Sequence, residues 1–413
     1  MSPSGRAGTV RSVIIAPMLE RTQARPAVRP GPPLRERVEA AAREAAPALL
    51  AYAAVRLTGL LVLTVAAAAG GRDVPEVLSR RWDAVWYARI AEHGYGYTVL
   101  TPGGAHSDLA FFPLLPALER LVSALVPVGP GGAGLLIGWT ASLVAAWGIY
   151  AVGARLHGPA AGTVLAALWG ATPTGFVQSM AYTETLFTAF AAWALYALLT
   201  GRWPEAGALA ALAGLTRPTA VAVVLAVAVP AALLLARSWR AGIPGRMLPR
   251  LHAPALAGLA LAPLGLAFYA LYVAVRRGDP FGYFAVQAGW GNGLDGGRAL
   301  AAFVHLQLRA HPPAGLALCA ALGLLGWLLL LSVRQRQPLP LLVYSFTVVA
   351  VSLAGSGYFG SKPRLIMPAF PLLLPAAVVI ARQQPARATL ICAVAALVSA
   401  VYGAVTLLGP GPP

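Results

Sequence analysis

Residues 111–126 read FFPLLPALERLVSALV, and the fold of the whole chain depends on where this short segment lies. Its apolar residues repeat at helical spacing and form one face: Leu114, Leu115, Leu118, Val122 and Leu125. Another face carries polar residues: Glu119, Arg120 and Ser123. Such a pattern is typical of a helix that lies in a membrane interface and does not span the bilayer. Prolines 113 and 116 suit its first turn.

The composition is that of an integral membrane protein. Of the 413 residues, 58% are hydrophobic and 11% are charged, and the mean hydropathy is +0.70, which excludes a soluble domain. About eleven apolar stretches are long enough to suggest helices that cross a bilayer. The predicted spans are 47–69, 132–154, 158–172, 183–200, 205–217, 219–236, 252–275, 313–333, 338–355, 364–381 and 387–408. The segments 158–172 and 205–217 are short, and the alternative that they form one re-entrant hairpin stays open.

The domain organisation follows from these stretches. Residues 1–45 are rich in Arg, Pro and Ala and predict a disordered cytoplasmic tail. Residues 46–408 predict one all-α transmembrane domain, in which 71–131 form a first external loop with interfacial helices. Residues 409–413 form a short tail. The two cysteines lie within apolar runs and have no metal-ligand spacing.

The distribution of arginines sets the orientation. The net charge of +17 comes mainly from the tail and from short loops, as the positive-inside rule requires, and it needs no nucleic-acid partner to explain it. If 111–126 does not cross, the arginine-rich loops are all cytoplasmic. The remaining polar loops then gather on the extracytoplasmic face.

The most informative acid lies in RRWDAVWYARIAEHGY, residues 80–95. A helix here places Asp83, Tyr87 and Ile90 along one face, and the aromatic residues seat it at headgroup depth. In an arbitrary loop, Asp83 would cap the helix or pair with a neighbouring arginine. At a lipid surface, partly desolvated, it has the raised basicity that proton abstraction from a hydroxyl requires, and we favour that role.

Other polar residues of the external segments are candidates with structural alternatives. Asp108 is a second acid, a metal ligand or the N-cap of the 111–126 helix. Tyr182 and Glu184 lie at the outer end of an apolar run, where Glu184 either binds sugar or complements the helix dipole. Gln287 and Trp290 belong to a segment that is otherwise an ordinary interfacial helix.

Three cations suggest a phosphate ligand. Arg217 has no acid near it in sequence, and an unpaired guanidinium at a membrane is costly unless it meets phosphate or carboxylate. Lys362, the only lysine, and Arg364 lie on the side where positive charge is disfavoured. The alternatives are snorkelling for Arg217 and nonspecific headgroup binding for the other two.

Several of these segments together resemble PIG-V-type mannosyltransferases. They are RWDAVWYARIAEHGY, AFFPLLP, PTGFVQSMAYTETLF, LTRPT, GDPFGYFAVQAGW and the late loop with Lys362 and Arg364. The resemblance implies the GT-C glycosyltransferase fold, a polyprenyl-phosphate sugar donor and an essential acid in the first external loop, a position that Asp83 matches. It implies mannose as the donor sugar. The short, arginine-rich chain is typical of a bacterial member, so the acceptor of the eukaryotic members does not carry over.

The sequence therefore predicts an inverting glycosyltransferase of the cell membrane, active at the extracytoplasmic face on a lipid-linked or cell-envelope acceptor. Asp83 is the predicted base, and Arg217, Lys362 and Arg364 are predicted to bind the donor phosphate. Residues predicted to bind sugar or acceptor are Trp82, Tyr87, Asp108, Tyr182, Glu184, Gln287 and Trp290. No nucleotide-binding or zinc-hydrolase motif is present, and a divalent ion is compatible with this scheme but not required. The alternatives are transfer of another sugar and a lipid or glycolipid transporter, although few ionisable groups lie at mid-span.

Overall fold

A computed structural model describes residues 34–411, and the chain divides into a unit that ends at Glu44 and a unit that begins at Ala45. Most of the predicted disordered tail, residues 1–33, lies outside the described residues. Residues 34–45 are helical, so the prediction of disorder is wrong for this part. The sequence LRERVEAAAREAA is rich in helix formers, and Arg35 pairs with Glu39 one turn later at 2.8 Å.

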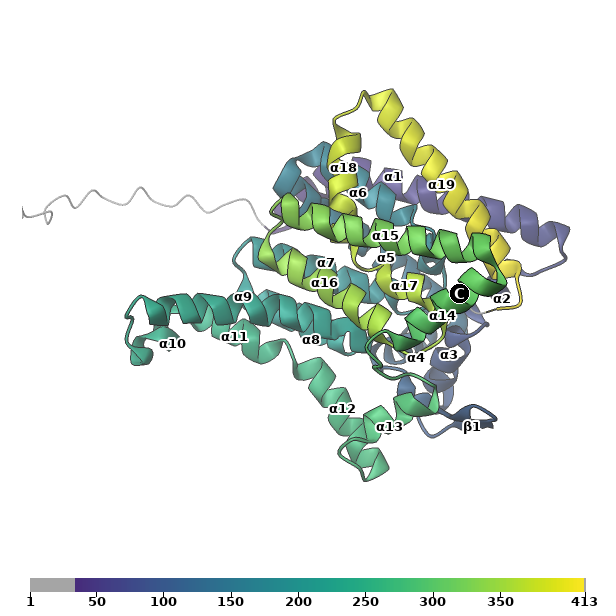
Figure 1. Cartoon of the computed structure of the whole chain (residues 1–413), viewed down its shortest axis with the longest axis horizontal. Coiled ribbons are helices and arrows are strands. Elements are labelled where there is room, and N and C mark those ends of the chain that lie inside the picture. The colour runs from purple at the N-terminus through teal and green to yellow at the C-terminus, as the bar shows by residue number, and fades with distance from the viewer. Residues whose placement is uncertain (1–33, 412–413) are drawn as a thin grey trace, which may run out of the picture. The chain divides into compact units, whose positions relative to one another are not determined.

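The described residues form helices joined by short loops, with one small β-hairpin (Figure 1). The elements of the first half are α1 (Leu34–Ala69), α2 (Val74–Ser79), α3 (Asp83–His93), β1 (Thr98–Thr101), β2 (Gly104–Ser107), α4 (Leu114–Leu125), α5 (Pro130–His157), α6 (Pro159–Gly170), α7 (Glu184–Leu199) and α8 (Trp203–Gly214). Those of the second half are α9 (Val221–Arg240), α10 (Leu248–Leu251), α11 (Ala253–Leu261), α12 (Leu264–Arg277), α13 (Gly282–Gly289), α14 (Arg298–Ala310), α15 (Pro312–Arg334), α16 (Leu339–Ala354), α17 (Lys362–Ile366), α18 (Leu374–Ala381) and α19 (Pro385–Leu408).

Every predicted span contains a helix, but the helices differ in length. Within residues 34–411, six helices are long and apolar enough to cross a membrane, and a seventh span results if the pair 359–366 and 370–381, bent by 74°, is counted as one. The short segments α6 and α8 do not form a hairpin with each other. Helix α6 packs on α5 and α18, whereas α8 packs on α7 and α11. The number of eleven crossings stays a prediction.

Close helix packing depends on small residues, as is usual where lipid surrounds a bundle. At three crossings the glycine of one helix faces the glycine of another, and an added Cβ would collide with the opposite backbone. The pairs are Gly153 with Gly162, Gly207 with Gly258, and Gly214 with Gly265. They fix α5 against α6, and α8 against α11 and α12.

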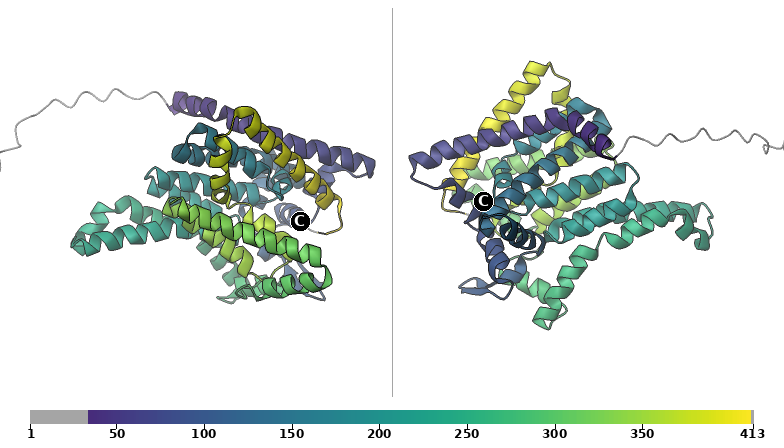
Figure 2. Two further views of the ribbon diagram at one scale, coloured as in Figure 1. Left: turned by 45° about the horizontal axis from the view of Figure 1, so that its top comes forward. Right: turned by 180° about the vertical axis from the view of Figure 1, so that it is seen from behind.

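Several short helices and the hairpin lie at one end of the second unit. Figure 1 shows α2, α3, β1, α13 and α14 toward one end of the bundle and α10 at the opposite end. The hairpin pairs Thr98 with Ser107 and Thr101 with Gly104 in antiparallel register. The view from behind in Figure 2 shows α12 leading away from the bundle, and α13, which follows it, packs on β2.

Helix α4 is short and amphipathic as predicted, but one of the residues predicted to form its polar face is buried. Glu119 is fully buried, and both of its carboxylate oxygens lack a hydrogen-bond partner. Its Oε1 lies where a side chain of Gly134, in α5, would be, because the glycine leaves a hollow there. The exposed positions of α4 include the apolar residues Leu121 and Leu125. The face that carries Glu119 therefore packs against protein.

This packing predicts that Gly134 tolerates no side chain. A Cβ at Gly134 would overlap Glu119 Oε1 and lie 2.8 Å from Ala181 Cβ. We expect Gly134→Ala to destabilise the protein by about 1–3 kcal/mol, the usual cost of overpacking. The measurement is the thermal unfolding midpoint in detergent, with Gly129→Ala as the control because nothing lies within 4 Å of a Cβ there. Equal midpoints for the two variants would contradict the packing.

Candidate active site

Asp83 is the first residue of α3, and the backbone before it is strained. Trp82 occupies the N-cap position with φ 51° and ψ −121°, a left-handed conformation that a bulky residue rarely adopts. The guanidinium of Arg81 lies 4.0 Å from the centre of the Trp82 ring and donates hydrogen bonds to the carbonyls of Leu407 and Gly409. These contacts fix the turn that presents Asp83.

Asp83 forms an ion pair with Arg364, a residue far away in the sequence. Its Oδ2 lies 2.7 Å from Arg364 Nη2, so the sequence-based alternative of a pair with an adjacent arginine is wrong. The Asp83 side chain is 31% exposed, whereas that of Arg364 is only 12% exposed. Solvent can thus reach the Asp83 carboxylate, whereas the Arg364 guanidinium that pairs with it is mostly enclosed.

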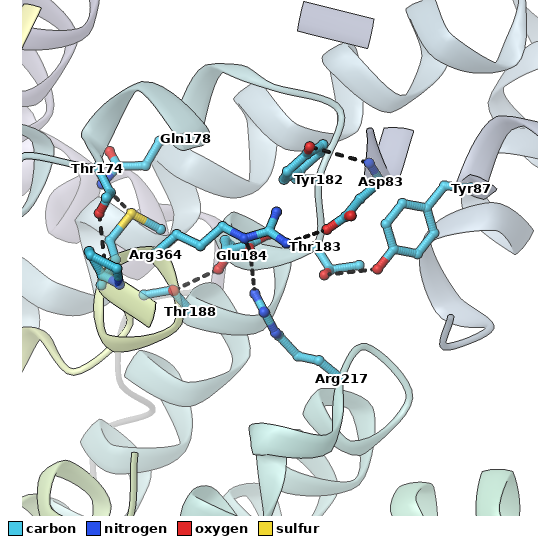
Figure 3. A network of polar contacts seen from close by, with 12 residues as sticks. Asp83, Tyr87, Thr174, Gln178, Tyr182, Thr183, Glu184, Thr188, Arg217 and Arg364 are labelled. Carbon is cyan, nitrogen blue, oxygen red and sulfur yellow. Dashed lines mark hydrogen bonds and ion pairs between the residues drawn. The ribbon is translucent and has the colours of Figure 1, made fainter. Parts of the chain in front are cut away.

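The pair continues into the protein through a second acid and a second arginine. Glu184 Oε1 lies 3.9 Å from Arg364 Nε and 2.8 Å from Arg217 Nη1. Figure 3 shows the Arg364 side chain extending past Glu184 toward Asp83, with Arg217 reaching Glu184 from another segment. The Glu184 side chain is 2% exposed and that of Arg217 10% exposed. We call Asp83, Arg364, Glu184 and Arg217 the charged row.

The charged row corrects the expectation that Arg217 has no acid near it. Arg217 and Glu184 are far apart in sequence, and the fold brings them together at the ends of α8 and α7. Glu184 also occupies the first turn of α7, where a negative charge complements the helix dipole. Glu184 therefore uses one negative charge both to pair with Arg217 and to complement the dipole of α7.

Two tyrosines line the row. The Asp83 N–H donates to the Tyr182 hydroxyl at 3.3 Å, and the Arg364 guanidinium lies 5.1 Å from the Tyr182 ring centre. Tyr87, one turn after Asp83, lies 3.3 Å from the hydroxyl of Thr183. Burial, and after it the charge on Asp83, raises the pKa of both tyrosine hydroxyls well above the ordinary range, so both stay protonated and available as donors.

Asp108, Gln287 and Trp290 brace the segment between α3 and α4 and take no part in the ion pairs of the charged row. Asp108 is buried, and its Oδ2 accepts hydrogen bonds from the N–H groups of Gly96 and Tyr97 at 2.9 Å. The N-cap interpretation of Asp108 is wrong, because its carboxylate bonds to this loop and not to the start of α4. Gln287 donates to the Ala110 carbonyl. Their predicted roles in sugar binding stay predictions.

Trp290 joins the loop to α3 through aromatic packing. Its indole N–H donates to the Ser107 carbonyl at 2.9 Å, and its ring stacks on His106 with centroids 4.3 Å apart. It also meets Trp86 edge-on at 5.0 Å. Because Trp86 belongs to α3, this packing connects the hairpin and α13 to the helix that carries Asp83.

Lys362 is close to Arg364 in sequence but has other partners. Its ammonium donates to the carbonyls of Ser352 and Gly355 at 3.0 and 2.6 Å, at the end of α16. The side chain is buried and lies over the Phe359 ring. A role for Lys362 at a phosphate would require these bonds to break, so the geometry favours the two arginines.

Sequence reasoning missed the roles of two ionisable residues, the half-buried Arg56 and the buried Glu119. Arg56, inside the first predicted span, donates to the Gly170 carbonyl at 3.2 Å and to the Ser179 hydroxyl at 2.8 Å, which ties α1 to the segment before Tyr182. Glu119 was assigned to an exposed face. The signal for Arg56 was a charge within an apolar run. Among the described residues, no group of three or more His, Cys, Asp or Glu side chains is arranged to hold a metal ion.

The comparisons with known proteins concern the fold. No protein-family model matches the sequence, and no curated protein matches it either. The crystal structure of ArnT from Cupriavidus metallidurans bound to undecaprenyl phosphate superposes with a TM-score of 0.51 at 16% identity, over 81% of this chain and 60% of that one. The chain has the GT-C fold. The apo structure of the same ArnT gives a TM-score of 0.47 at 16% identity, over 73% of this chain and 54% of that one.

This fold confirms the predicted multispanning GT-C class. The short β-hairpin is a departure from the all-α prediction. The apolar helices agree with it, and the protein is a multi-pass membrane protein. The chain spans about 60% of the length of the ArnT chain that it matches.

The geometry of the row predicts that Glu184 is essential for stability. Glu184→Gln would leave Arg217 and part of the charge of Arg364 without a buried counter-ion, and breaking a buried pair costs about 3–5 kcal/mol. We expect a lower thermal unfolding midpoint. Glu205→Gln, at an exposed first-turn position of α8, is the matched control and should change little. A Glu184→Gln variant as stable as this control would contradict the arrangement.

Glu119 predicts a pH dependence of stability. Burial raises the pKa of Glu119 from 4.5 to about 9, so the folded protein keeps this proton to a higher pH than the unfolded chain does. Its contribution to stability is complete below the unfolded pKa and is lost as the pH rises through about 9. We expect the difference in unfolding midpoint, Glu119→Gln minus wild type, to increase between pH 5 and pH 9. The same difference for exposed Glu92→Gln should stay flat.

Proposed function

We propose that the protein is a glycosyltransferase that takes a sugar from a polyprenyl-phosphate donor and transfers it, with inversion, to an acceptor hydroxyl. The observation that carries this proposal is the charged row. A partly exposed carboxylate, Asp83, lies at one end of it, and two enclosed guanidinium groups lie behind, in a chain with the GT-C fold. The carboxylate can accept the proton of an acceptor hydroxyl, and the guanidinium groups can stabilise the charge of a departing phosphate.

Asp83 is the better candidate for the base of the two acids in the row. Its side chain is 31% exposed, whereas Glu184 is 2% exposed and engaged by Arg217. In the proposed reaction, the acceptor oxygen forms a bond to C1 of the sugar while the bond from C1 to the phosphate oxygen breaks. The electron pair of that bond leaves with the phosphate, and the acceptor proton goes to Asp83. Attack from the face opposite the phosphate inverts C1.

Arg364 and Arg217 are the proposed ligands of the phosphate. Arg364 Nε and Nη1 and Arg217 Nε are buried donors for which the described residues provide no hydrogen-bond acceptor. Unpaired buried donors are costly, and phosphate oxygens would satisfy them with charge-assisted bonds. The two groups meet at the same Glu184 oxygen, so one phosphate can lie near both.

An apolar groove supports a donor with a long apolar tail. It has a volume of about 460 Å³ and is lined almost wholly by apolar side chains of α4, α5, α7 and α8. Leu186 and Ala141 in its lining pack in one apolar cluster with Tyr87, which faces the charged row. We propose that the polyprenyl tail lies here. ArnT, which shares the fold, is a GT-C glycosyltransferase crystallised with undecaprenyl phosphate.

The sugar, the acceptor and the face of the membrane are the finer parts of the proposal. Mannose follows from the resemblance of the segments around Asp83, Tyr182 and Arg217 to PIG-V-type mannosyltransferases. The distribution of arginines between the loops supports an extracytoplasmic site. A lipid-linked or cell-envelope acceptor is proposed because such a site faces the cell envelope. The transporter alternative has less support, because Arg56, charged and within a span, is occupied by structural hydrogen bonds.

The experiment is transfer of labelled mannose from polyprenyl-phosphate mannose in membranes that contain the protein, with endogenous lipids as acceptors. We expect Asp83→Asn to lower the rate by a factor on the order of 10² to 10⁴, the usual contribution of a general base. Glu92→Gln, which removes a charge at the exposed end of the same helix, should leave the rate unchanged. Equal rates in wild type and Asp83→Asn would exclude Asp83 as the base.

A further inference from the structure

The proposed base is not free in this structure. Asp83 Oδ2 lies 2.7 Å from Arg364 Nη2, the geometry of a charge-assisted hydrogen bond. A carboxylate whose charge is balanced by a guanidinium at this distance attracts a hydroxyl proton less strongly than a free one, whichever of its oxygens the hydroxyl meets. If the protein works as proposed above, on which this inference rests, the structure holds the base in a masked state.

Arg364 is the only member of the charged row with contacts to both acids. It reaches Asp83 through Nη2 and Glu184 through Nε, at 2.7 and 3.9 Å, while its Nη1 has no acceptor among the described residues. The two carboxylates and two guanidinium groups balance in charge. A donor phosphodiester adds one negative charge, so three anions then share two cations, and the anion whose release costs least is favoured to leave.

Burial decides which anion that is. Glu184 is 2% exposed and contacts both arginines, so moving it would leave a desolvated charge and cost several kcal/mol. Asp83 is 31% exposed and can turn toward solvent at a much smaller cost. The bond between Asp83 and Arg364 is therefore the weakest link of the row when a phosphate arrives.

Two arginines near Asp83 in the sequence or in the row are already engaged by other partners. Arg81 is bound to the carbonyls of Leu407 and Gly409, and Arg217 is bound to Glu184. The remaining groups facing Asp83 are the hydroxyls of Tyr182 and Tyr87, which are neutral. Neither Arg81 nor Arg217 is therefore free to pair with a carboxylate released from Arg364.

We propose that Arg364 is a switch between the base and the donor: in the resting protein it masks Asp83, and when the donor binds it transfers to the phosphate and frees Asp83 for the acceptor proton. Arg364 acts on the base as a positioning residue and on the phosphate as a ligand. The order of events follows, because the acceptor can be deprotonated only after the donor is in place. Water that reaches the empty site finds no active base.

The switch has a thermodynamic consequence that needs no transfer assay. If Asp83 and the phosphate compete for Arg364, then removing the charge of Asp83 must tighten phosphate binding, because the coupling between two ligands of one group is reciprocal. We expect Asp83→Asn to bind undecaprenyl phosphate about tenfold more tightly than wild type, which corresponds to about 1.4 kcal/mol. The dissociation constant is measured with the full chain in nanodiscs.

Three controls isolate the contact from general electrostatics. Glu92→Gln removes a negative charge from the same helix at an exposed position, where Arg120 contacts only the backbone carbonyl, and should leave the affinity unchanged. Undecaprenol, which lacks the phosphate, should bind wild type and Asp83→Asn equally. In an Arg364→Gln background, Asp83→Asn should no longer tighten binding. If Arg364→Gln does not fold, the comparison of Asp83→Asn with Glu92→Gln stands by itself.

The outcomes separate the switch from the proposed function. Tighter phosphate binding by Asp83→Asn, with unchanged binding by Glu92→Gln, supports the switch. Equal or weaker binding by Asp83→Asn overturns it, yet leaves the phosphate site and the transferase proposal standing. No binding of undecaprenyl phosphate by any of the folded variants overturns both the switch and the assignment of the donor phosphate.

Discussion

The ion pair between Glu184 and Arg217 is the constraint on which the site depends. A carboxylate that is 2% exposed is tolerable only if a cation satisfies it, and Arg217 does so at 2.8 Å. This pair fixes the end of α8 against the start of α7 and provides the charge near which Arg364 is held. Arg364 in turn holds Asp83 at the start of α3. The residues come from four separate segments, so the row exists only in the folded chain.

The bundle makes this row possible by holding its helices close together. Glycine pairs let the backbone of α8 approach those of α11 and α12 closely, which positions the end of α8 after which Arg217 lies. The segment between α3 and α4 is braced independently by Asp108, Trp290 and the small hairpin. The strained backbone at Trp82 then directs Asp83 toward Arg364. The packed helices and the braced segment between α3 and α4 leave Asp83, the proposed base, partly exposed.

Much of this was predictable from the sequence, one residue at a time. Hydropathy predicted the helices, because a backbone in lipid must satisfy its hydrogen bonds internally. The position of an acid among aromatic residues predicted Asp83 as a candidate base. The pairing was not predictable, because Arg217 and Glu184 are neighbours only after folding. The periodicity of 111–126 predicted an amphipathic helix but not the burial of Glu119, which depends on a hollow at Gly134. Lys362 was chosen for its charge, and its carbonyl partners could not be read from spacing.

The central claim is that a lipid-linked phosphate binds between Arg364 and Arg217. The most direct test is a cryo-EM structure of the full chain in nanodiscs with undecaprenyl phosphate. The account predicts phosphate oxygens about 3 Å from the guanidinium nitrogens of both arginines, with Glu184 still paired to Arg217. A phosphate bound elsewhere, for instance at Lys362 after loss of its bonds to Ser352 and Gly355, would contradict it.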